Sequence, residues 1–480
     1  MKTLDQLLQN NEAFSSYGNL ETEIAHISID SRTVEKDGLY IAIAGSNSDG
    51  HAFIDHAIEN GAVAVVCEHL PNEQKKGVTY IQVPNTRETT GYIASAFYDH
   101  PSREITLIGV TGTNGKTTVA TLVYQFLQLL GKLSAVLSTA GDFFDDKKLE
   151  VTRHAPTSIE IVEFNRILRQ LVDAGCEYVA FEVSSHALDQ GRIAGLDIDV
   201  AIYTNLSQDH LDYHKTMENY ASAKKKLFDN VTPKAKAVVN IDDSYGKYMV
   251  EDTQAEIFYY SVENGKWKVE NYNAQGSTLI NNDREYHLPL LGTFNIYNTL
   301  AAAQALLALG FEEKEVLDHI ENLKPITGRA EIVNHPSGVV GVVDYAHTAD
   351  GLENILTSLQ NVLTEDQKLI TIIGCGGDRD TTKRKPMADM ALKYSDYSIF
   401  TSDNPRTEDP EKIIDMMCEG LEESESWTRI TDRAEAIAHA LGYAQPNDVI
   451  VMAGKGHEDY QEINGVKYPF SDKHIFLSIN

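Results

Sequence analysis

The sequence predicts a three-domain α/β protein, from its length, its alternating elements and its composition. The 480 residues exceed one compact core, and domains of roughly 100–200 residues give about three. Short β-like runs alternate with longer helical patterns along the whole length, which is typical of parallel sheets covered by helices. Hydrophobic residues make up 42% and charged residues 23%, as in folded rather than disordered proteins.

The first predicted domain covers 1–100. A turn at His100 and Pro101 precedes a new apolar strand, which sets its end. A helix over 53–60 leads to Gly61. The strands expected in this domain are 38–44, 62–68 and 79–83.

The second predicted domain covers 101–328 and is expected to hold a mostly parallel sheet. It opens with a strand at 105–110, a glycine-rich loop, and a helix that ends at Gly131. The apolar residues of that helix recur at offsets of 0, 3, 4, 7 and 11: Val119, Leu122, Val123, Phe126 and Leu130. Further strands are expected at 178–183, 200–204 and 237–241.

A break near 325–328 begins the third predicted domain, 329–480, which we expect to be Rossmann-like. Its strands are predicted at 339–344, 369–374, 397–401 and 448–453, with helices between them. Chemically interesting residues follow several of these strands, and open α/β sheets bind ligands at the carboxyl ends of their strands.

The charge of the chain excludes several classes of partner. Against 71 acidic residues there are 41 lysines and arginines, a net charge of −30, which repels nucleic acid and anionic membranes.

The start lacks the apolar segment of a signal peptide, and no apolar run reaches about 18 residues. The four cysteines are far apart and form no CxxC pair, which indicates reduced thiols. We therefore expect a cytoplasmic protein without a membrane span.

The strongest motif is Gly-Val-Thr-Gly-Thr-Asn-Gly-Lys-Thr-Thr at 109–118. Its glycines allow backbone N–H groups to close on a phosphate, and the following helix adds its positive end. Lys116 would reach the β- and γ-phosphates, and the Thr117 hydroxyl would bind Mg²⁺. A plain Walker A motif has glycine where this chain has Val110. The motif predicts ATP binding by Gly112, Thr113, Asn114, Gly115, Lys116, Thr117 and Thr118.

Two polar clusters follow later strands, Glu-Val-Ser-Ser-His at 182–186 and Asn-Leu-Ser-Gln-Asp-His-Leu-Asp at 205–212. Each closes a β-rich run, so both are expected near the phosphate loop, and carboxylates and imidazoles there suit Mg²⁺. Three adjacent lysines at 224–226 could form a solvated helical face, and composition does not choose among them.

Charged groups after separate strands of the third domain could hold a zwitterion. Arg379 and Arg406 would pair with its carboxylate and Glu458 with its ammonium, because arginine binds carboxylates through two hydrogen bonds. The glycines at 374–377 do not indicate a nicotinamide site, since Arg379 occupies the third glycine position of that motif.

The form of the phosphate loop resembles that of the Mur ligases and the folylpolyglutamate synthases, which make amides through an acyl phosphate. The stretch 182–228 resembles the central domain of the Mur ligases, and most of all their MurE branch. Asp-Ser-Arg at 30–32 and the segment 48–53 are similar to the uridine-binding segments of that branch, and 328–331 to its hinge. The resemblance covers essentially the whole chain, in order.

The resemblance implies roles for individual residues. Lys116, Lys224 and His210 are implied as catalytic, with Lys224 carbamylated to N6-carboxylysine. The implied magnesium ligands are Thr117, Glu182, His210 and Lys224. Further contacts to ATP are implied for Asn295, Asn298, Arg329 and Asp344. Contacts to the uridine-diphosphate muramoyl dipeptide are implied for Ser31, Ser184, Gln190 and Arg192. The implied amino-acid site comprises Arg379, Asp403, Asn404, Pro405, Arg406, Gly454 and Glu458.

The Asp-Asn-Pro-Arg form at 403–406 goes with meso-diaminopimelate in the MurE branch, whereas lysine-adding members have alanine at the fourth position. One segment departs from the family: close relatives carry Asn-Thr-Thr where this chain has Arg-His-Ala-Pro-Thr-Ser at 153–158.

The resemblance implies an ATP-dependent ligase that adds meso-diaminopimelate to UDP-N-acetylmuramoyl-L-alanyl-D-glutamate in peptidoglycan precursor synthesis. L-Lysine as the added amino acid is the alternative. Less favoured are a folylpolyglutamate synthase and a non-catalytic P-loop nucleotide switch, for which Glu182, His210 and Lys224 would be superfluous. The expected cofactors are ATP and Mg²⁺, the expected partners are these small molecules, and a monomer is expected.

Overall fold

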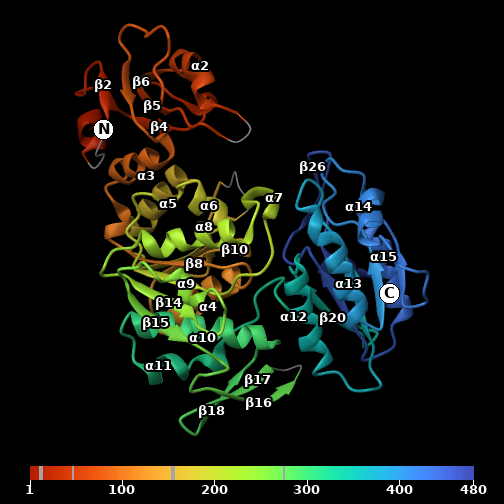
Figure 1. Ribbon diagram of the computed structural model, residues 1–480. Coiled ribbons are helices and arrows are strands. Elements are labelled where there is room, and N and C mark those ends of the chain that lie inside the picture. The colour runs from red at the N-terminus through yellow and green to blue at the C-terminus, as the bar shows by residue number, and fades with distance from the viewer. Residues whose placement is uncertain (10–13, 46–47, 153–156, 274–275, 480) are drawn as a thin grey trace.

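The structure is a computed structural model that describes residues 1–9, 14–45, 48–152, 157–273 and 276–479. Three units are visible in Figure 1: a red and orange amino-terminal one, a larger middle one, and a blue carboxyl-terminal one beside it. The main sheets are largely parallel, which confirms the predicted three-domain α/β class. Within the described residues, none of the helices has both the length and the apolar character needed to cross a membrane.

The first unit contains a five-stranded sheet in the order β2-β7-β6-β5-β4, in which only β2 is antiparallel to its neighbour. Its elements are β1 (Lys2–Thr3), α1 (Leu4–Leu8), β2 (Ser15–Tyr17), β3 (Glu23–Ile24), β4 (His26–Ser28), β5 (Gly38–Ile41), α2 (Ile54–Glu59), β6 (Ala62–Cys67), β7 (Thr79–Gln82) and α3 (Thr86–Phe97).

The middle unit is built on an eight-stranded sheet in the order β11-β10-β9-β12-β8-β13-β14-β15, antiparallel only at the β11-β10-β9 edge. Its elements as far as α8 are β8 (Thr106–Thr111), α4 (Lys116–Leu129), β9 (Ser134–Ser138), β10 (Gly141–Phe144), β11 (Lys147–Lys148), α5 (Ile161–Asp173), β12 (Tyr178–Glu182), α6 (Ser185–Asp189), β13 (Val200–Tyr203), α7 (Leu211–His214) and α8 (Met217–Asp229). The rest are β14 (Lys236–Asn240), α9 (Gly246–Met249), β15 (Glu256–Tyr260), β16 (Lys268–Asn273), β17 (Gly276–Asn281), β18 (Arg284–Leu288), α10 (Thr293–Ala308) and α11 (Glu313–Leu317), of which β16, β17 and β18 form a separate antiparallel sheet.

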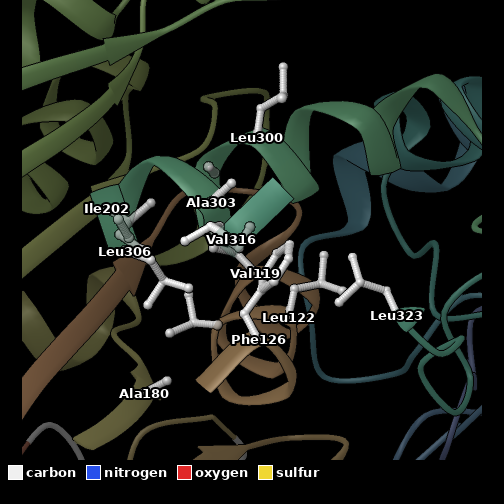
Figure 2. Packing of buried hydrophobic residues seen from close by; sticks show 14 of the residues in the cluster. Val119, Leu122, Phe126, Ala180, Ile202, Leu300, Ala303, Leu306, Val316 and Leu323 are labelled. Carbon is white, nitrogen blue, oxygen red and sulfur yellow. The ribbon is translucent and has the colours of Figure 1, made fainter. Parts of the chain in front are cut away.

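Buried apolar side chains fix the phosphate-binding helix α4 in place. Val119, Leu122 and Phe126, at the predicted helical spacing, are fully buried in one cluster with residues of α10 and of the sheet. Figure 2 shows these side chains together with Ala303 and Leu306 of α10 and Ile202 of β13. Because α4 is clamped between sheet and helix, its first turn is held at a fixed place relative to the ends of β8 and β13.

The third unit contains a six-stranded sheet in the order β19-β20-β24-β21-β22-β23, in which only β19 is antiparallel. Apolar clusters cover both of its faces, as in a doubly wound fold. Its elements are β19 (Glu331–Asn334), β20 (Val340–Asp344), α12 (Ala349–Gln360), β21 (Leu369–Ile373), α13 (Arg384–Tyr394), β22 (Tyr397–Phe400), α14 (Pro410–Met417), β23 (Trp427–Arg429), α15 (Arg433–Tyr443), β24 (Val449–Ala453), β25 (Tyr460–Ile463), β26 (Val466–Pro469) and α16 (Asp472–Ser478).

Each strand predicted from the sequence is present, and its ends lie within a few residues of the predicted ends. The strands that were not predicted include the antiparallel edge β10-β11 and the sheet β16-β17-β18, which mix polar and charged residues with few apolar ones. They also include β1, β2, β3, β4, β15, β19, β23, β25 and β26. The domain limits near 100 and 328 stay predictions. Each of the three large sheets lies entirely within one predicted domain.

The third unit contains a fully buried ion pair that predicts a stability effect. Arg433 donates from Nε and Nη2 to the two carboxylate oxygens of Asp472, each at 2.7 Å. We expect Asp472→Asn to lower the free energy of unfolding by about 3–5 kcal/mol, because it leaves a buried guanidinium without its counter-charge. The measurement is urea unfolding followed by tryptophan fluorescence.

Asp415→Asn is the matched control. Asp415 pairs with Arg429 at 2.7 Å, but both side chains are exposed, so its loss should cost less than about 1 kcal/mol. Equal losses in the two variants would contradict the prediction.

Candidate active site

The carboxyl ends of parallel strands from two units face one cavity of about 590 Å³. The middle unit contributes residues that follow β8, β12 and β13, and the third unit contributes residues that follow β20, β21, β22 and β24. The expectation that residues after separate strands would come together is therefore confirmed for these strands. Figure 1 shows the third unit beside the middle one, with α12 near the space between them.

The phosphate loop runs from the end of β8 into α4 as the sequence predicts. Gly112 and Gly115 have φ angles of +153° and +86°, which favour glycine. A Cβ at Gly112 would lie 1.8 Å from Thr204 Oγ1, and one at Gly115 would lie 2.5 Å from Asn298 Oδ1. Both positions therefore require glycine, because the side chains of Thr204 and Asn298 approach the loop too closely for a Cβ.

Lys116 is folded back onto its own loop. Its Nζ donates to the carbonyl oxygens of Gly112 at 2.9 Å and Thr113 at 2.8 Å. Burial lowers the pKa of Lys116, an effect that Glu182 and Asp209 oppose. The two carbonyl oxygens compensate the charge of this ammonium only in part. An anionic phosphate bound in the loop would supply a full counter-charge.

Oxygen atoms gather at the first turn of α4. Thr117 donates from Oγ1 to Glu182 Oε1 at 2.9 Å, and the backbone N–H of Thr139 donates to the same oxygen at 2.6 Å. Arg329 donates from Nη2 to Thr117 Oγ1 at 2.8 Å. A hydroxyl and a carboxylate side by side are the hard oxygen ligands that Mg²⁺ prefers, so this donor set fits the predicted ion.

Of the three adjacent lysines, one points into the cavity. Lys224 is buried, donates from Nζ to Gly112 O at 2.7 Å, and lies over the Tyr220 ring at 4.4 Å. Lys225 pairs instead with Asp229 at 2.7 Å, and Lys226 pairs with Asp189. The interpretation of all three as a solvated face is therefore wrong for Lys224, and also for Lys225, which is buried as well. Burial, with a smaller effect of the Lys116 charge, lowers its pKa well below the usual value.

His210 begins α7 in a left-handed conformation with φ +56° and lines the cavity. Its ring lies 4.8 Å from that of His186, and burial lowers its pKa. The adjacent Asp209 carboxylate lies 3.5 Å from Lys383 Nζ and 3.5 Å from His347 Nε2, both in the third unit. Burial alone would raise the pKa of Asp209, but these neighbours hold it well below the usual range.

The predicted amino-acid group forms the opposite wall. Asn404 donates from Nδ2 to Glu458 Oε2 at 2.8 Å. Arg406 donates from Nη1 to Gly377 O at 2.8 Å, and its Nε lies 3.6 Å from Glu462. Arg379 is exposed but also lines the cavity. The cavity lining includes Arg379, Asp403, Asn404, Arg406, Gly454 and Glu458, and Pro405 is buried between them.

The further residues predicted to contact ATP fall into two groups. Asn298 lines the cavity and donates to Asn295 Oδ1 at 3.0 Å, while Asn295 itself is held by Leu291 O at 2.7 Å. Asp344 accepts two backbone N–H bonds at 2.7 Å, from Ala330 and Ala346, and burial raises its pKa. The Arg329 guanidinium lies over the Tyr345 ring, 4.4 Å from its centroid. Its Nε has no hydrogen-bond partner among the described residues.

Three of the four predicted nucleotide-sugar residues lie at this cavity. Ser184 caps α6, and Gln190 accepts from Arg192 at 2.6 Å. Arg192 also pairs with Glu160 at 3.0 Å. Ser31 lies in the first unit instead, where it contacts His56 Nδ1 at 3.0 Å.

The segment that departs from the family pattern is described only in part. Residues 153–156 lie outside the described residues. Thr157 lines the cavity, and Ser158 donates to Ser184 Oγ at 3.1 Å.

Several residues of the cavity belong to no motif that is recognisable in the sequence. Asp350 of α12 accepts from Asn114 Nδ2 at 2.7 Å and from Ser207 Oγ at 3.1 Å, which joins the third unit to the phosphate loop. Thr139 and Lys383 were not singled out either. Thr139 directly follows β9, a position that strand prediction could have flagged. Cys375 also lines the cavity, and burial raises the pKa of its thiol to about 12.

Three family models match the chain in order. The Mur ligase family catalytic domain matches residues 23–98, the Mur ligase middle domain 110–306, and the Mur ligase glutamate ligase domain 328–456.

Full-length relatives are found among proteins and among structures. The chain is 43% identical to the UDP-N-acetylmuramoyl-L-alanyl-D-glutamate--2,6-diaminopimelate ligase of Bacteroides thetaiotaomicron, with 99% of both chains covered. It is 38% identical to the ligase of the same name from Geobacillus thermodenitrificans, covering 98% of each. A solved structure of a ligase with this name has a TM-score of 0.68 and 33% identity, covering 99% of this chain and 98% of its own.

The fold is also shared with a folylpolyglutamate synthase from Mycobacterium tuberculosis, at a TM-score of 0.62, 18% identity, and coverage of 77% of this chain and 92% of that one. Three successive domain matches and the full-length identities lead to one conclusion: the chain belongs to the Mur ligase family.

Proposed function

We propose that the protein is an ATP-dependent ligase that joins meso-diaminopimelate to the D-glutamate of UDP-N-acetylmuramoyl-L-alanyl-D-glutamate. One observation carries the proposal: a phosphate loop and a carboxylate-and-arginine group suited to a zwitterion share a single cavity. The names of the full-length relatives support the choice of substrates. The reaction would belong to peptidoglycan precursor synthesis.

The first step joins the glutamate side chain to phosphate. A carboxylate oxygen of the D-glutamate attacks the γ-phosphorus of ATP, the bond to the bridging oxygen breaks, and ADP leaves with that electron pair. Lys116 would turn from the carbonyls of its own loop toward the phosphates and neutralise developing charge. Asn298, Arg329 and Asp344 would bind the rest of the nucleotide.

Magnesium, when bound, supplies positive charge that neutralises the phosphate oxygens. Thr117 and Glu182 would hold one ion, as their adjacent oxygens suit it. His210 and Lys224 would hold a second magnesium ion. The Lys224 amine would first have to be converted into an anionic group. A neutral Lys224 amine can attack CO₂, forming a C–N bond and losing a proton to leave a carbamate. The lowered pKa of Lys224 favours that neutral amine.

The second step forms the amide. The amine of the amino acid attacks the acyl carbon, and the C–O bond to phosphate breaks. Arg379 and Arg406 would hold a carboxylate of the amino acid, and Glu458 an ammonium. An acyl phosphate is sensitive to water, and the contacts of Asp350 and Lys383 with the middle unit are suited to keep the site closed.

The nucleotide-sugar substrate would span two units. Ser184, Gln190 and Arg192 lie at the cavity, whereas Ser31 lies in the first unit. The substrate has its uridine and its dipeptide at opposite ends, so a binding site of this extent suits it. We assign the uridine end to Ser31 and the dipeptide end to the other three.

A ligation assay tests the function directly. The enzyme receives ATP and UDP-N-acetylmuramoyl-L-alanyl-D-glutamate with either meso-diaminopimelate or L-lysine, and ADP and the ligated product are measured. We expect product with meso-diaminopimelate and little with lysine. ADP formation that needs neither substrate would support a nucleotide switch, and product with lysine alone would support the lysine-adding alternative.

The role of Lys224 predicts chemical rescue. Lys224→Ala should lose nearly all activity, because its carboxylate-bearing group is gone, and acetate or formate should restore part of it. Lys225→Ala is the control: Lys225 pairs with acidic residues outside the cavity, so that variant should keep near-normal turnover. Similar activity in the two variants would contradict the assignment.

The role of Arg406 predicts a change in amino-acid preference. Arg406→Ala should raise the KM for meso-diaminopimelate steeply, since an unpaired carboxylate in a closed site costs about 2–5 kcal/mol. Lysine lacks the distal carboxylate, so it should gain relative to meso-diaminopimelate. The measurement is kcat/KM for both amino acids; an unchanged ratio between them would remove Arg406 from the specificity determinants.

A further inference from the structure

A lysine lies directly behind the wall of the amino-acid site. Lys455 follows β24 and is completely buried. Its Nζ lies 3.2 Å from Glu458 Oε2, 3.3 Å from Asn404 Oδ1 and 3.4 Å from Asp403 Oδ1. One ammonium therefore contacts three side chains of the amino-acid site that the family resemblance implies.

Lys455 does not itself reach the cavity. Among the described residues, the cavity lining includes Asp403, Asn404 and Glu458 but not Lys455. On its other sides the ammonium faces two aromatic rings, Tyr460 and Phe470, each at 5.8 Å. Any effect of Lys455 on a ligand must therefore pass through its neighbours.

The hydrogen bonds around Lys455 fix the orientation of Asn404. Asn404 Oδ1 accepts from Lys455 and also from the backbone N–H of Glu462 at 2.8 Å. Two donors at the oxygen direct the amide nitrogen the other way, where it donates to Glu458 Oε2. Since Glu458 Oε2 also accepts from Lys455, the carboxylate is held from two directions. A side chain held in this way is already arranged for its ligand.

The local charges match the ligand. Two carboxylates and one ammonium leave a net charge of −1, which one incoming ammonium would neutralise. Burial and the nearby Asp403 raise the pKa of Glu458, while Lys455 and Asn404 oppose that rise. Arg433 of α15, which pairs with Asp472, and the hydroxyl of Tyr345 interact electrostatically with both carboxylates, and the hydroxyl of Tyr460 interacts with Glu458.

We propose that Lys455 is a positioning residue of the amino-acid site, which keeps Glu458 charged and holds Asp403 and Glu458 directed into the cavity to receive an ammonium of the amino acid. This inference rests on the proposed function. The affinity for the amino acid would then depend on the Lys455 ammonium, although this group does not contact the amino acid.

The test is Lys455→Met, which keeps the length of the side chain and removes its charge. We expect the KM for meso-diaminopimelate to rise about ten- to a hundredfold, as expected for a charged site that has lost an internal partner. The KM values for ATP and the nucleotide-sugar, and kcat at saturating amino acid, should stay near wild type.

The pH profile gives a second readout. Lys455 is one of the groups that lower the pKa of Glu458, so this pKa is higher in the variant, and the carboxyl group must lose its proton to pair with an ammonium. The KM of the variant for meso-diaminopimelate should therefore fall as pH rises, more steeply than that of wild type. A variant that loses thermal stability but keeps the wild-type KM and pH profile would overturn the proposal.

Lys467→Met is the matched control. Lys467 lies on β26, exposed to solvent and 3.9 Å from the centroid of the same Tyr460 ring. It contacts neither carboxylate of the proposed site among its described interactions, so its loss should leave the KM for the amino acid unchanged. An equal rise in both variants would attribute the effect to Tyr460 rather than to Lys455.

If Lys455→Met does not fold, the ionisation of Glu458 in the wild-type protein tests the proposal instead. Infrared difference spectra between wild type and Glu458→Gln should show no carbonyl stretch of a protonated carboxyl group in wild type at neutral pH. Such a band, present in wild type and lost in Glu458→Gln, would overturn the proposal. Failure of the proposed function looks different, because wild type itself would then ligate no diamino acid.

Discussion

Two buried lysine side chains share one carbonyl oxygen in the phosphate loop of this protein. Lys116 and Lys224 both donate to Gly112 O, at 2.9 and 2.7 Å, although they come from different helices. Burial and mutual repulsion make this arrangement costly, and the packing of α4 and α8 on one sheet holds it in place. A chain with a net charge of −30 thereby brings two lysine nitrogens to one internal point, where an anion would otherwise be repelled.

The third unit completes that centre with carboxylates and cations of its own. Asp350 reaches the Asn114 side chain of the phosphate loop, and Lys383 reaches Asp209 beside His210. These contacts join α12 and the start of α13 to loops that follow β8 and β13. Because they involve the phosphate loop itself, the position of the third unit and the shape of the nucleotide site depend on each other.

Much of this could be predicted from the sequence, because strand ends and glycine spacing are local signals. The phosphate loop, Glu182 and the groups at 403–406 all follow apolar strands, and parallel strands bring such positions to one edge. The choice of Lys224 over Lys225 was not accessible from residue types, since it depends on which helix face meets the sheet. Asp350 and Lys383 were missed because their partners lie 236 and 174 positions away. No local pattern marks a contact between units.

Cys375 shows how the cavity tolerates a potential nucleophile. Cys375 lies in the wall of the cavity beside the glycines that follow β21, in the cavity where the proposed reaction forms an activated acyl group. A thiolate there would capture that group as a thioester, diverting the intermediate from the amine. With the pKa of the thiol raised to about 12, the sulfur stays protonated and is a weak nucleophile at neutral pH. The same burial makes Cys375 a poor target for alkylating agents and peroxide, so the reaction centre can contain a cysteine that these reagents do not readily modify.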